Sequence, residues 1–150
     1  MTAGAPRVGD GVLLAAYPAG FLDGQTIEMN LFAASTFTNI GQIFVFDKAD
    51  GVDLVSVGGT PVSQAGSSGG AVVRTQDGSL TGIIVTATAS STTSGRDLRA
   101  LTIGHINRSL QAGLGGIATF LSGNINALAD TFNREIAPLL TQKLIAVLKK

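Results

Sequence analysis

The sequence predicts an all-β domain, either a closed barrel or a sandwich, followed by a helical tail. Between residues 12 and 103, seven short apolar segments alternate with clusters of Gly, Asp, Asn and Ser, as in strands joined by turns. Beyond Gly104 the apolar residues recur every three or four positions, which indicates one face of a helix. Charged residues make up only 13% of the 150 residues and the mean hydropathy is positive, so a folded core is expected.

The expected strands coincide with the apolar segments. In the second segment, apolar and polar residues largely alternate with a period of two, which predicts a half-buried strand. Turn residues at 47–51 and at 75–78 predict two hairpins, and the second contains the favourable pair Asp-Gly. The predicted strands are 12–17, 27–33, 43–46, 52–57, 71–74, 80–88 and 98–103.

The helical tail is predicted from apolar residues at helical spacing. Pro138 lies among them and is expected to kink the helix or to start a new one, because proline has no amide hydrogen. Glycines between 113 and 116 predict a joint between a β domain of residues 1–112 and a tail of residues 113–150. The tail is expected to pack on the β domain; a short coiled coil and a linker are the alternatives. Its apolar stripe comprises Leu121, Ile125, Leu128, Phe132, Ile136 and Leu139.

Charge and composition exclude several classes of function. Lys and Arg total 10 and Asp and Glu total 10, and this balance argues against a broad basic face for nucleic acid. With no Cys and one His, the chain has no thiolate or multi-His metal site, and neither a metal nor an organic cofactor is expected. No apolar run approaches the length of a membrane span, and the first residues lack a signal-peptide pattern. These observations predict no particular cellular compartment.

The most informative segment is the Gly/Ser-rich loop at 64–73, Gln-Ala-Gly-Ser-Ser-Gly-Gly-Ala-Val-Val. A phosphate-binding loop would need a Lys and the start of a helix after the glycines, and neither is expected here. A nucleophilic serine instead needs a tight turn that projects its hydroxyl, with backbone N–H groups aimed at the developing oxyanion. Glycines on both sides of Ser67 and Ser68 permit such a turn.

This loop resembles the Gly-Asp-Ser-Gly-Gly-Pro-Val signature of trypsin- and chymotrypsin-like serine proteases, and the Gly-Asn-Ser-Gly-Gly form of bacterial members. Segments 8–18, 78–85 and 102–110 are similar to other parts of the second barrel in that family, so the resemblance covers roughly residues 7–112. It implies a six-stranded Greek-key barrel equivalent to that second barrel. It also implies serine endopeptidase activity on a protein or peptide substrate.

The resemblance assigns roles to particular residues. Ser68 matches the nucleophile, and the backbone N–H groups of Gly66 and Ser68 match the oxyanion hole. Val62 matches the floor of the specificity pocket, which implies a preference for a small or medium apolar side chain. The Ser- and Thr-rich stretch 86–95 is expected to be a mobile loop or to border the substrate cleft. Val85, Thr86 and Ala87 match the wall of this pocket, and Ala65 completes the residues expected to bind substrate.

The general base and its orienting Asp have no match. The family places both before the nucleophile on a first barrel, whereas no His precedes Ser68 in this sequence. His105 is expected to be a surface or capping residue, and turn chemistry accounts for Asp23, Asp47, Asp50, Asp53 and Asp77.

This chain alone is therefore expected to be inactive, and to need a missing N-terminal barrel or to self-associate. The alternative is a non-catalytic, protease-like barrel that acts as a binding or assembly module through its helical tail.

Overall fold

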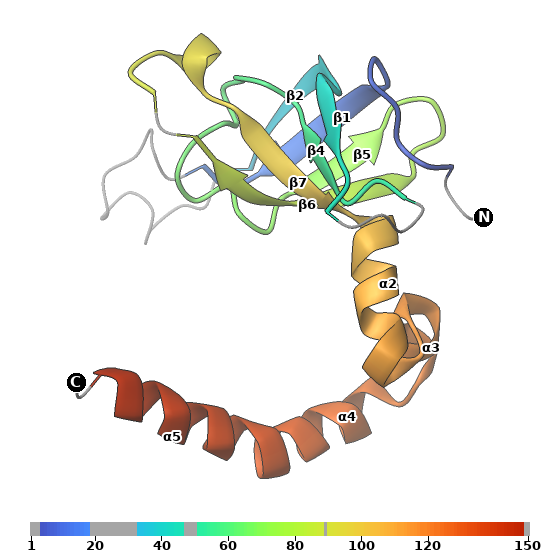
Figure 1. Cartoon of the computed structure of the whole chain (residues 1–150), viewed down its shortest axis with the longest axis vertical. Coiled ribbons are helices and arrows are strands. Elements are labelled where there is room, and N and C mark those ends of the chain that lie inside the picture. The colour runs from blue at the N-terminus through green and yellow to red at the C-terminus, as the bar shows by residue number, and fades with distance from the viewer. Residues whose placement is uncertain (1–3, 19–32, 47–50, 89, 149–150) are drawn as a thin grey trace. The chain divides into compact units, whose positions relative to one another are not determined.

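A computed structural model describes residues 4–18, 33–46, 51–88 and 90–148 of the chain. The chain divides between Ile106 and Asn107 into two compact units, a β unit and a helical unit (Figure 1). The division lies within helix α2 (Ile103–Leu114), which also contains the boundary expected at residue 112.

The β unit is one antiparallel sheet of seven strands in the order β2-β1-β5-β6-β7-β4-β3. Each predicted segment other than 27–33 overlaps one of these strands, and β5 has the predicted bounds. The strands are β1 (Gly11–Ala16), β2 (Ala34–Asn39), β3 (Gln42–Phe44), β4 (Leu54–Ser56), β5 (Ala71–Arg74), β6 (Leu80–Ala87) and β7 (Leu98–Thr102).

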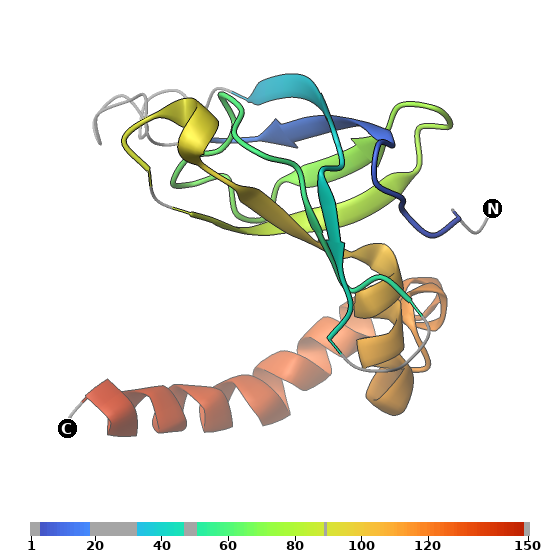
Figure 2. The same cartoon turned by 45° about the horizontal axis from the view of Figure 1, so that its top comes forward.

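The two edges of this sheet are joined by the chain itself. Strand β2 pairs with β1 at one edge, β3 pairs with β4 at the other, and only Ile40 and Gly41 separate β2 from β3. The Ile40 amide donates to the Asp10 carbonyl at 2.9 Å and the Gly41 amide donates to the Ser56 carbonyl at 2.8 Å. Pairing thus continues on both sides of the link, and the sheet curls into a barrel-like form (Figures 1 and 2).

The core of the β unit is made by one side of the curled sheet. In β1, alternate residues from Val12 to Ala16 are at most 3% exposed, because successive side chains of a strand point to opposite faces. Each fully buried aliphatic side chain contributes about 1.5–3 kcal/mol to folding. The core comprises Val12, Leu14, Ala16, Ile40, Val55, Val57, Val62, Val72, Ile84, Leu98 and Ala100.

Strand β2 is not among the strands that the sequence predicts. Its residues, Ala-Ser-Thr-Phe-Thr-Asn, include few apolar side chains, and none of them is fully buried. Pairing with β1, from Ala34 opposite Ala16 to Asn39 opposite Gly11, holds it in strand conformation. The expected strand 27–33 lies outside the described residues apart from its last position, which directly precedes β2.

The helical unit continues α2 with three more α-helices and one π-helical turn. Gly115 and Gly116 separate α2 from the next helix, and the Asn124 side chain caps α4 by accepting a bond from the Ala127 amide at 3.1 Å. Together α4, η3 and α5 form one continuous helix (Figures 1 and 2). These elements are α3 (Ile117–Ser122), α4 (Ile125–Thr131), η3 (Phe132–Ile136) and α5 (Ala137–Leu148).

The π-helical turn ends at Ile136, two positions before Pro138. Proline has no N–H, and in a regular helix its ring would collide with the carbonyl of residue 134, four positions earlier. The Ala137 amide donates instead to the Phe132 carbonyl, five positions earlier, which adds one residue to the turn. The predicted kink or new helix at Pro138 is thus replaced by a π-helical turn, through which the helix continues into α5.

The apolar stripe of the tail is not covered by the other helices of its unit. Its side chains keep exposed fractions between 39% for Leu128 and 59% for Leu139. Whether the stripe packs on the β unit stays a prediction.

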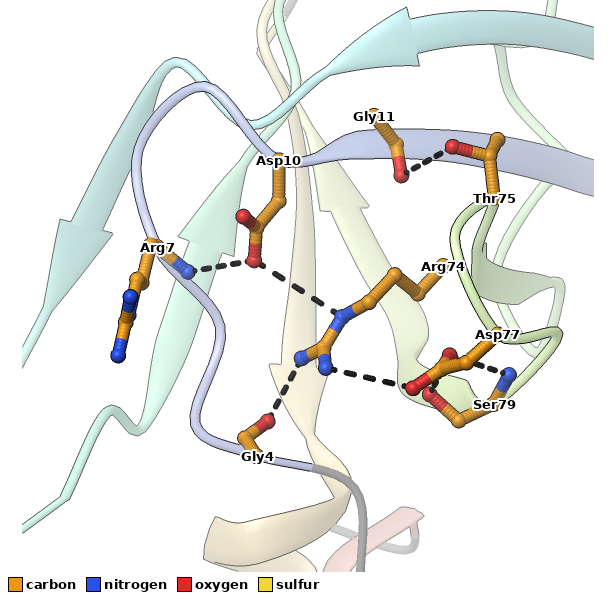
Figure 3. Close-up of polar contacts among 8 residues, drawn as sticks. All are labelled: Gly4, Arg7, Asp10, Gly11, Arg74, Thr75, Asp77 and Ser79. Atoms are coloured by element: carbon orange, nitrogen blue, oxygen red, sulfur yellow. Dashed lines mark hydrogen bonds and ion pairs between the residues drawn. The ribbon is translucent and has the colours of Figure 1, made fainter.

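A buried cation ties the N-terminal segment to the turn between β5 and β6 (Figure 3). Arg74 is 8% exposed; its Nη2 donates to the Gly4 carbonyl at 2.6 Å. Its Nε lies 3.8 Å from Asp10 Oδ2, and its Nη1 lies 3.7 Å from Asp77 Oδ2. Two carboxylates thus compensate the burial of one guanidinium.

Asp77 makes the stability of this turn depend on pH. The Ser79 hydroxyl donates to Asp77 Oδ1 at 2.6 Å and the Ser79 amide donates to the same oxygen at 3.0 Å. The hydroxyl bond first and the amide bond next, with a smaller effect of the nearby Arg74 charge, hold the pKa of Asp77 below its ordinary value of 3.8. The folded state therefore favours the ionised form of Asp77. The contribution of ionised Asp77 to the free energy of unfolding is present above the unfolded-state pKa and is lost as the pH falls through the lower folded-state pKa.

We therefore expect the free energy of unfolding of Asp77→Asn to fall less steeply than that of the wild type below about pH 4. Urea unfolding at a series of pH values measures this. The free energy of unfolding of Ser79→Ala should also fall less steeply, because this substitution removes the hydrogen bond that lowers the pKa most. If the free energies of unfolding of both variants fell with pH as steeply as that of the wild type, the pH dependence would not come from Asp77.

Candidate active site

Ser68 lies in a tight loop between β4 and β5. Gly66 and Gly69 have φ values of +89° and +87°, a backbone region that residues with a side chain rarely adopt, so the chain turns sharply on both sides of the serine pair. Ser67 points inward: it is 1% exposed, and its Oγ donates to the Val62 carbonyl at 2.5 Å. Ser68 is exposed. The turn therefore gives adjacent serines different roles, one structural and one accessible.

A β-bulge holds the hydroxyl of Ser68. The register of β6 against β7 shifts between Ile84 and Thr86, so that Val85 is an extra residue in β6. The carbonyl of Val85 accepts a hydrogen bond from Ser68 Oγ at 3.3 Å. Bulges of this kind are over-represented beside active sites, where they redirect a single residue.

Two backbone N–H groups of the loop are open to a ligand. Within the described part of the chain, neither the Gly66 amide nor the Ser68 amide donates a hydrogen bond, and both residues are exposed. The next amide, that of Gly69, is in contrast bonded to the Ile84 carbonyl at 2.8 Å. Both amides are therefore available to donate to a ligand without breaking a hydrogen bond in the described part of the chain.

A pocket of about 470 Å³ opens beside Ser68. Its walls come from the β4–β5 loop, the end of β6 and the β6–β7 loop. The structure brings Ser68 together in its lining with the predicted residues Ala65, Val85, Thr86 and Ala87. Binding of a substrate by these residues stays a prediction. The other lining residues are Ser63, Gln64, Thr88, Ser90 and Arg96, and all of them are polar.

Val62 is the predicted pocket residue that the structure places elsewhere. Its side chain is 0% exposed and belongs to the core, and the neighbouring residue Ser63 lines the pocket instead. The expected apolar floor is therefore not formed by the Val62 side chain. Sequence analysis also missed Arg96, because nothing in the Ser- and Thr-rich stretch before it indicates which way the guanidinium points.

No imidazole and no carboxylate lines the pocket among the residues that the structure describes. His105 lies towards the other end of β6. Strand β7 ends with Thr102 opposite Gly82, about 10 Å along β6 from the bulge residue Val85 that holds Ser68, and His105 follows in α2. His105 is thus not placed to act as a base for Ser68.

His105 instead forms a side-chain pair with Asp53. Its Nδ1 lies 2.8 Å from Asp53 Oδ1, and the ring of Phe46 meets the imidazole edge-on at a centroid distance of 5.4 Å. The Phe46 amide donates to the other carboxylate oxygen of Asp53 at 2.6 Å, and Asp53 is only 6% exposed. The capping oxygen of α2 belongs to Thr102, whose Oγ1 accepts from the His105 amide at 3.0 Å. Thr102, and not His105, thus caps α2, while the His105 side chain is 26% exposed. Asp53 bonds the Phe46 amide across the predicted hairpin connection and also pairs with His105, which turn chemistry alone does not account for.

No protein-family model matches the chain, and no curated protein matches it. In the described ranges, no group of three or more His, Cys, Asp or Glu side chains could hold a metal ion. None of the helices described is both long and apolar enough to cross a membrane.

We expect His105→Ala to lower the free energy of unfolding by about 1–3 kcal/mol, because it takes the imidazole away from a buried carboxylate. A double-mutant cycle with Asp53→Asn, measured by urea unfolding, should give a coupling energy of at least about 0.5 kcal/mol. The amide NMR signals of residues 63–68 should stay unchanged in both variants. Additive effects would mean that the two side chains do not support each other.

Proposed function

We propose that this chain carries the nucleophile of a serine endopeptidase and corresponds to the second, Greek-key barrel of trypsin- and chymotrypsin-like proteases. The placement of Ser68 carries the proposal: an exposed hydroxyl beside a pocket, next to two backbone N–H groups without an acceptor in the described chain. Counting β2 and β3 as one bent strand gives a six-stranded arrangement, which supports the same barrel type.

The mechanism is acyl transfer. Ser68 Oγ attacks the scissile carbonyl carbon while a base removes the hydroxyl proton, and the Gly66 and Ser68 amides stabilise the negative oxygen of the tetrahedral intermediate. Collapse of the intermediate expels the amine, which takes up the proton, and leaves an ester on Ser68. Water then hydrolyses that ester by the same steps. The side chain that precedes the scissile bond occupies the pocket.

The base in this mechanism comes from outside the present sequence. The pocket lining, as far as the structure describes it, contains neither His nor carboxylate. A His with its orienting Asp, contributed by a first barrel, would complete the site. General-base assistance is worth about 10²–10⁴ in rate, so the chain alone should react more slowly by that factor.

Labelling with a fluorophosphonate probe tests the proposal. The native protein should take up one adduct at Ser68, mapped by peptide mass spectrometry, and this 150-residue chain should label about 10²–10⁴ times more slowly.

Two variants of the native protein are the controls. Ser68→Ala should abolish the adduct. Ser67→Ala should keep it if the protein stays folded, because the Ser67 hydroxyl is buried and bonded to a carbonyl. A native protein that remains unlabelled, or an adduct that survives Ser68→Ala, would overturn the proposed activity.

A second candidate function is a non-catalytic assembly module that acts through the helical unit. The observation that favours it is the exposed apolar stripe, whose side chains the other helices of that unit leave uncovered. Large apolar side chains exposed along one helical stripe are typical of interaction sites.

For this second candidate we expect the whole chain to self-associate in sedimentation velocity experiments. Leu128→Asp combined with Ile136→Asp should weaken association at least about tenfold, because charges would enter an apolar interface. The matched control, Asn126→Asp with Asn133→Asp, adds the same charge beside the stripe and should leave association unchanged. A monomeric wild type, or association that survives the stripe variant, would rule out the helical unit as the contact surface.

A further inference from the structure

Arg96 is held firmly at the pocket beside Ser68. It ends the β6–β7 loop directly after the short helix η2 (Thr93–Gly95), whose last residue donates its amide to the Thr92 side chain at 3.2 Å. The loop packs closely on Gly59, where an added Cβ would lie 2.9 Å from the Arg96 carbonyl oxygen. The backbone of Arg96 is therefore positioned by contacts with the β4–β5 loop.

The guanidinium of Arg96 is fixed by neutral partners. Its Nε donates to the Ser90 carbonyl at 3.3 Å and its Nη1 donates to the Ser63 carbonyl at 3.2 Å. Ser63 belongs to the β4–β5 loop and Ser90 to the β6–β7 loop, so the guanidinium bonds to both loops that line the pocket. These two hydrogen bonds occupy two of the five N–H donors of an arginine and leave its charge uncompensated.

No carboxylate in the described part of the chain pairs with Arg96. The adjacent acid, Asp97, is engaged elsewhere, because its Oδ2 lies 2.8 Å from Arg99 Nε and its Oδ1 accepts from the Ser56 hydroxyl. The pocket lining thus carries one positive charge and, among the described residues, no negative one. A half-buried guanidinium with unused N–H groups is suited to bind a carboxylate, in which two oxygens match its planar geometry.

Two hydroxyls of the lining add donors. Thr88 Oγ1 accepts from the Asp97 amide at 2.7 Å and Ser90 Oγ accepts from the Thr92 amide at 3.4 Å, so each hydroxyl can still donate its own hydrogen. A basic side chain would be repelled by Arg96, and an apolar one would desolvate the guanidinium without replacing its hydrogen bonds.

We propose that the pocket beside Ser68 selects an acidic side chain, and that Arg96 is the residue that determines this specificity. The proposal rests on the proposed function, since it names the substrate class of that same site: proteins or peptides with Glu or Asp immediately before the scissile bond. The proposed preference for an acidic side chain replaces the preference for a small or medium apolar one, which the resemblance implies.

Binding, measured without any reaction, tests the proposal on the 150-residue chain. Four blocked peptides, acetyl-Ala-Ala-X-amide with X as Glu, Gln, Val or Lys, are titrated while the amide NMR signals of residues 63–68, 85–88 and 96 are followed. The Glu peptide should bind at least about tenfold more tightly than the isosteric, neutral Gln peptide at low salt, and the difference should shrink as salt is added. The Val and Lys peptides should bind more weakly than the Glu peptide.

Variants of two arginines complete the experiment. Arg96→Gln should abolish the preference for Glu over Gln. Arg99→Gln, a matched loss of charge three positions along the chain, should keep it, because Arg99 pairs with Asp97 and lies over the ring of Phe44. The comparison of Glu with Gln on the wild type needs no variant, so it still decides the question if Arg96→Gln does not fold.

The outcomes separate this proposal from the proposed activity. Equal affinity for Glu and Gln, no shift at the pocket with any peptide, or a Glu preference that survives Arg96→Gln would overturn the role of Arg96. A Glu preference in a native protein that resists fluorophosphonate would keep the specificity and reject the endopeptidase. Labelling at Ser68 without a Glu preference would keep the endopeptidase and reject the acidic specificity.

Discussion

Both edges of the sheet meet at Ile40, whose side chain is 1% exposed and lies in the core. Its amide donates to the Asp10 carbonyl, and its carbonyl accepts from the Gly9 amide at 2.8 Å, so the main chain is held on both sides. The amide of the next residue, Gly41, already donates to Ser56 in β4. Ile40 therefore joins the strands at both edges of the sheet. The curl of the sheet, and with it the position of the two loops that wall the pocket, depends on that junction.

The pocket is produced by irregular positions in otherwise regular strands. The bulge at Val85 directs one carbonyl to the Ser68 hydroxyl, and the left-handed backbone at Gly66 and Gly69 turns the loop so that this hydroxyl is exposed. The close approach of Gly59 to the β6–β7 loop positions the backbone of Arg96, another residue of the pocket lining. Each of these features costs regular pairing or backbone freedom, and their concentration around one pocket supports a role in binding.

Two arginines of the β unit show how charge is used differently in one fold. Arg74 is 8% exposed and lies within 3.8 Å of two carboxylates, which fits a structural tie between the N-terminal segment and a turn (Figure 3). Arg96 lines the pocket and has neutral carbonyls as its partners. Similarly, the pair of Asp53 and His105 has the groups of a base and its orienting acid, yet it joins the start of α2 to the segment before β4.

The sequence by itself determined the features that depend on neighbouring residues. Apolar segments bounded by turn residues predicted every strand except β2, the spacing of the tail predicted its helices, and the glycines around Ser68 predicted the exposed serine. Only the tertiary structure decided β2, the burial of Val62, the pair of Asp53 and His105, and the position of Arg96. These depend on contacts between distant segments: Asp53 and His105 are 52 positions apart in the sequence, and Ser63 and Arg96 are 33 positions apart. Local periodicity carries no information about such pairs, because it reports which side of an element is apolar and not what that side meets.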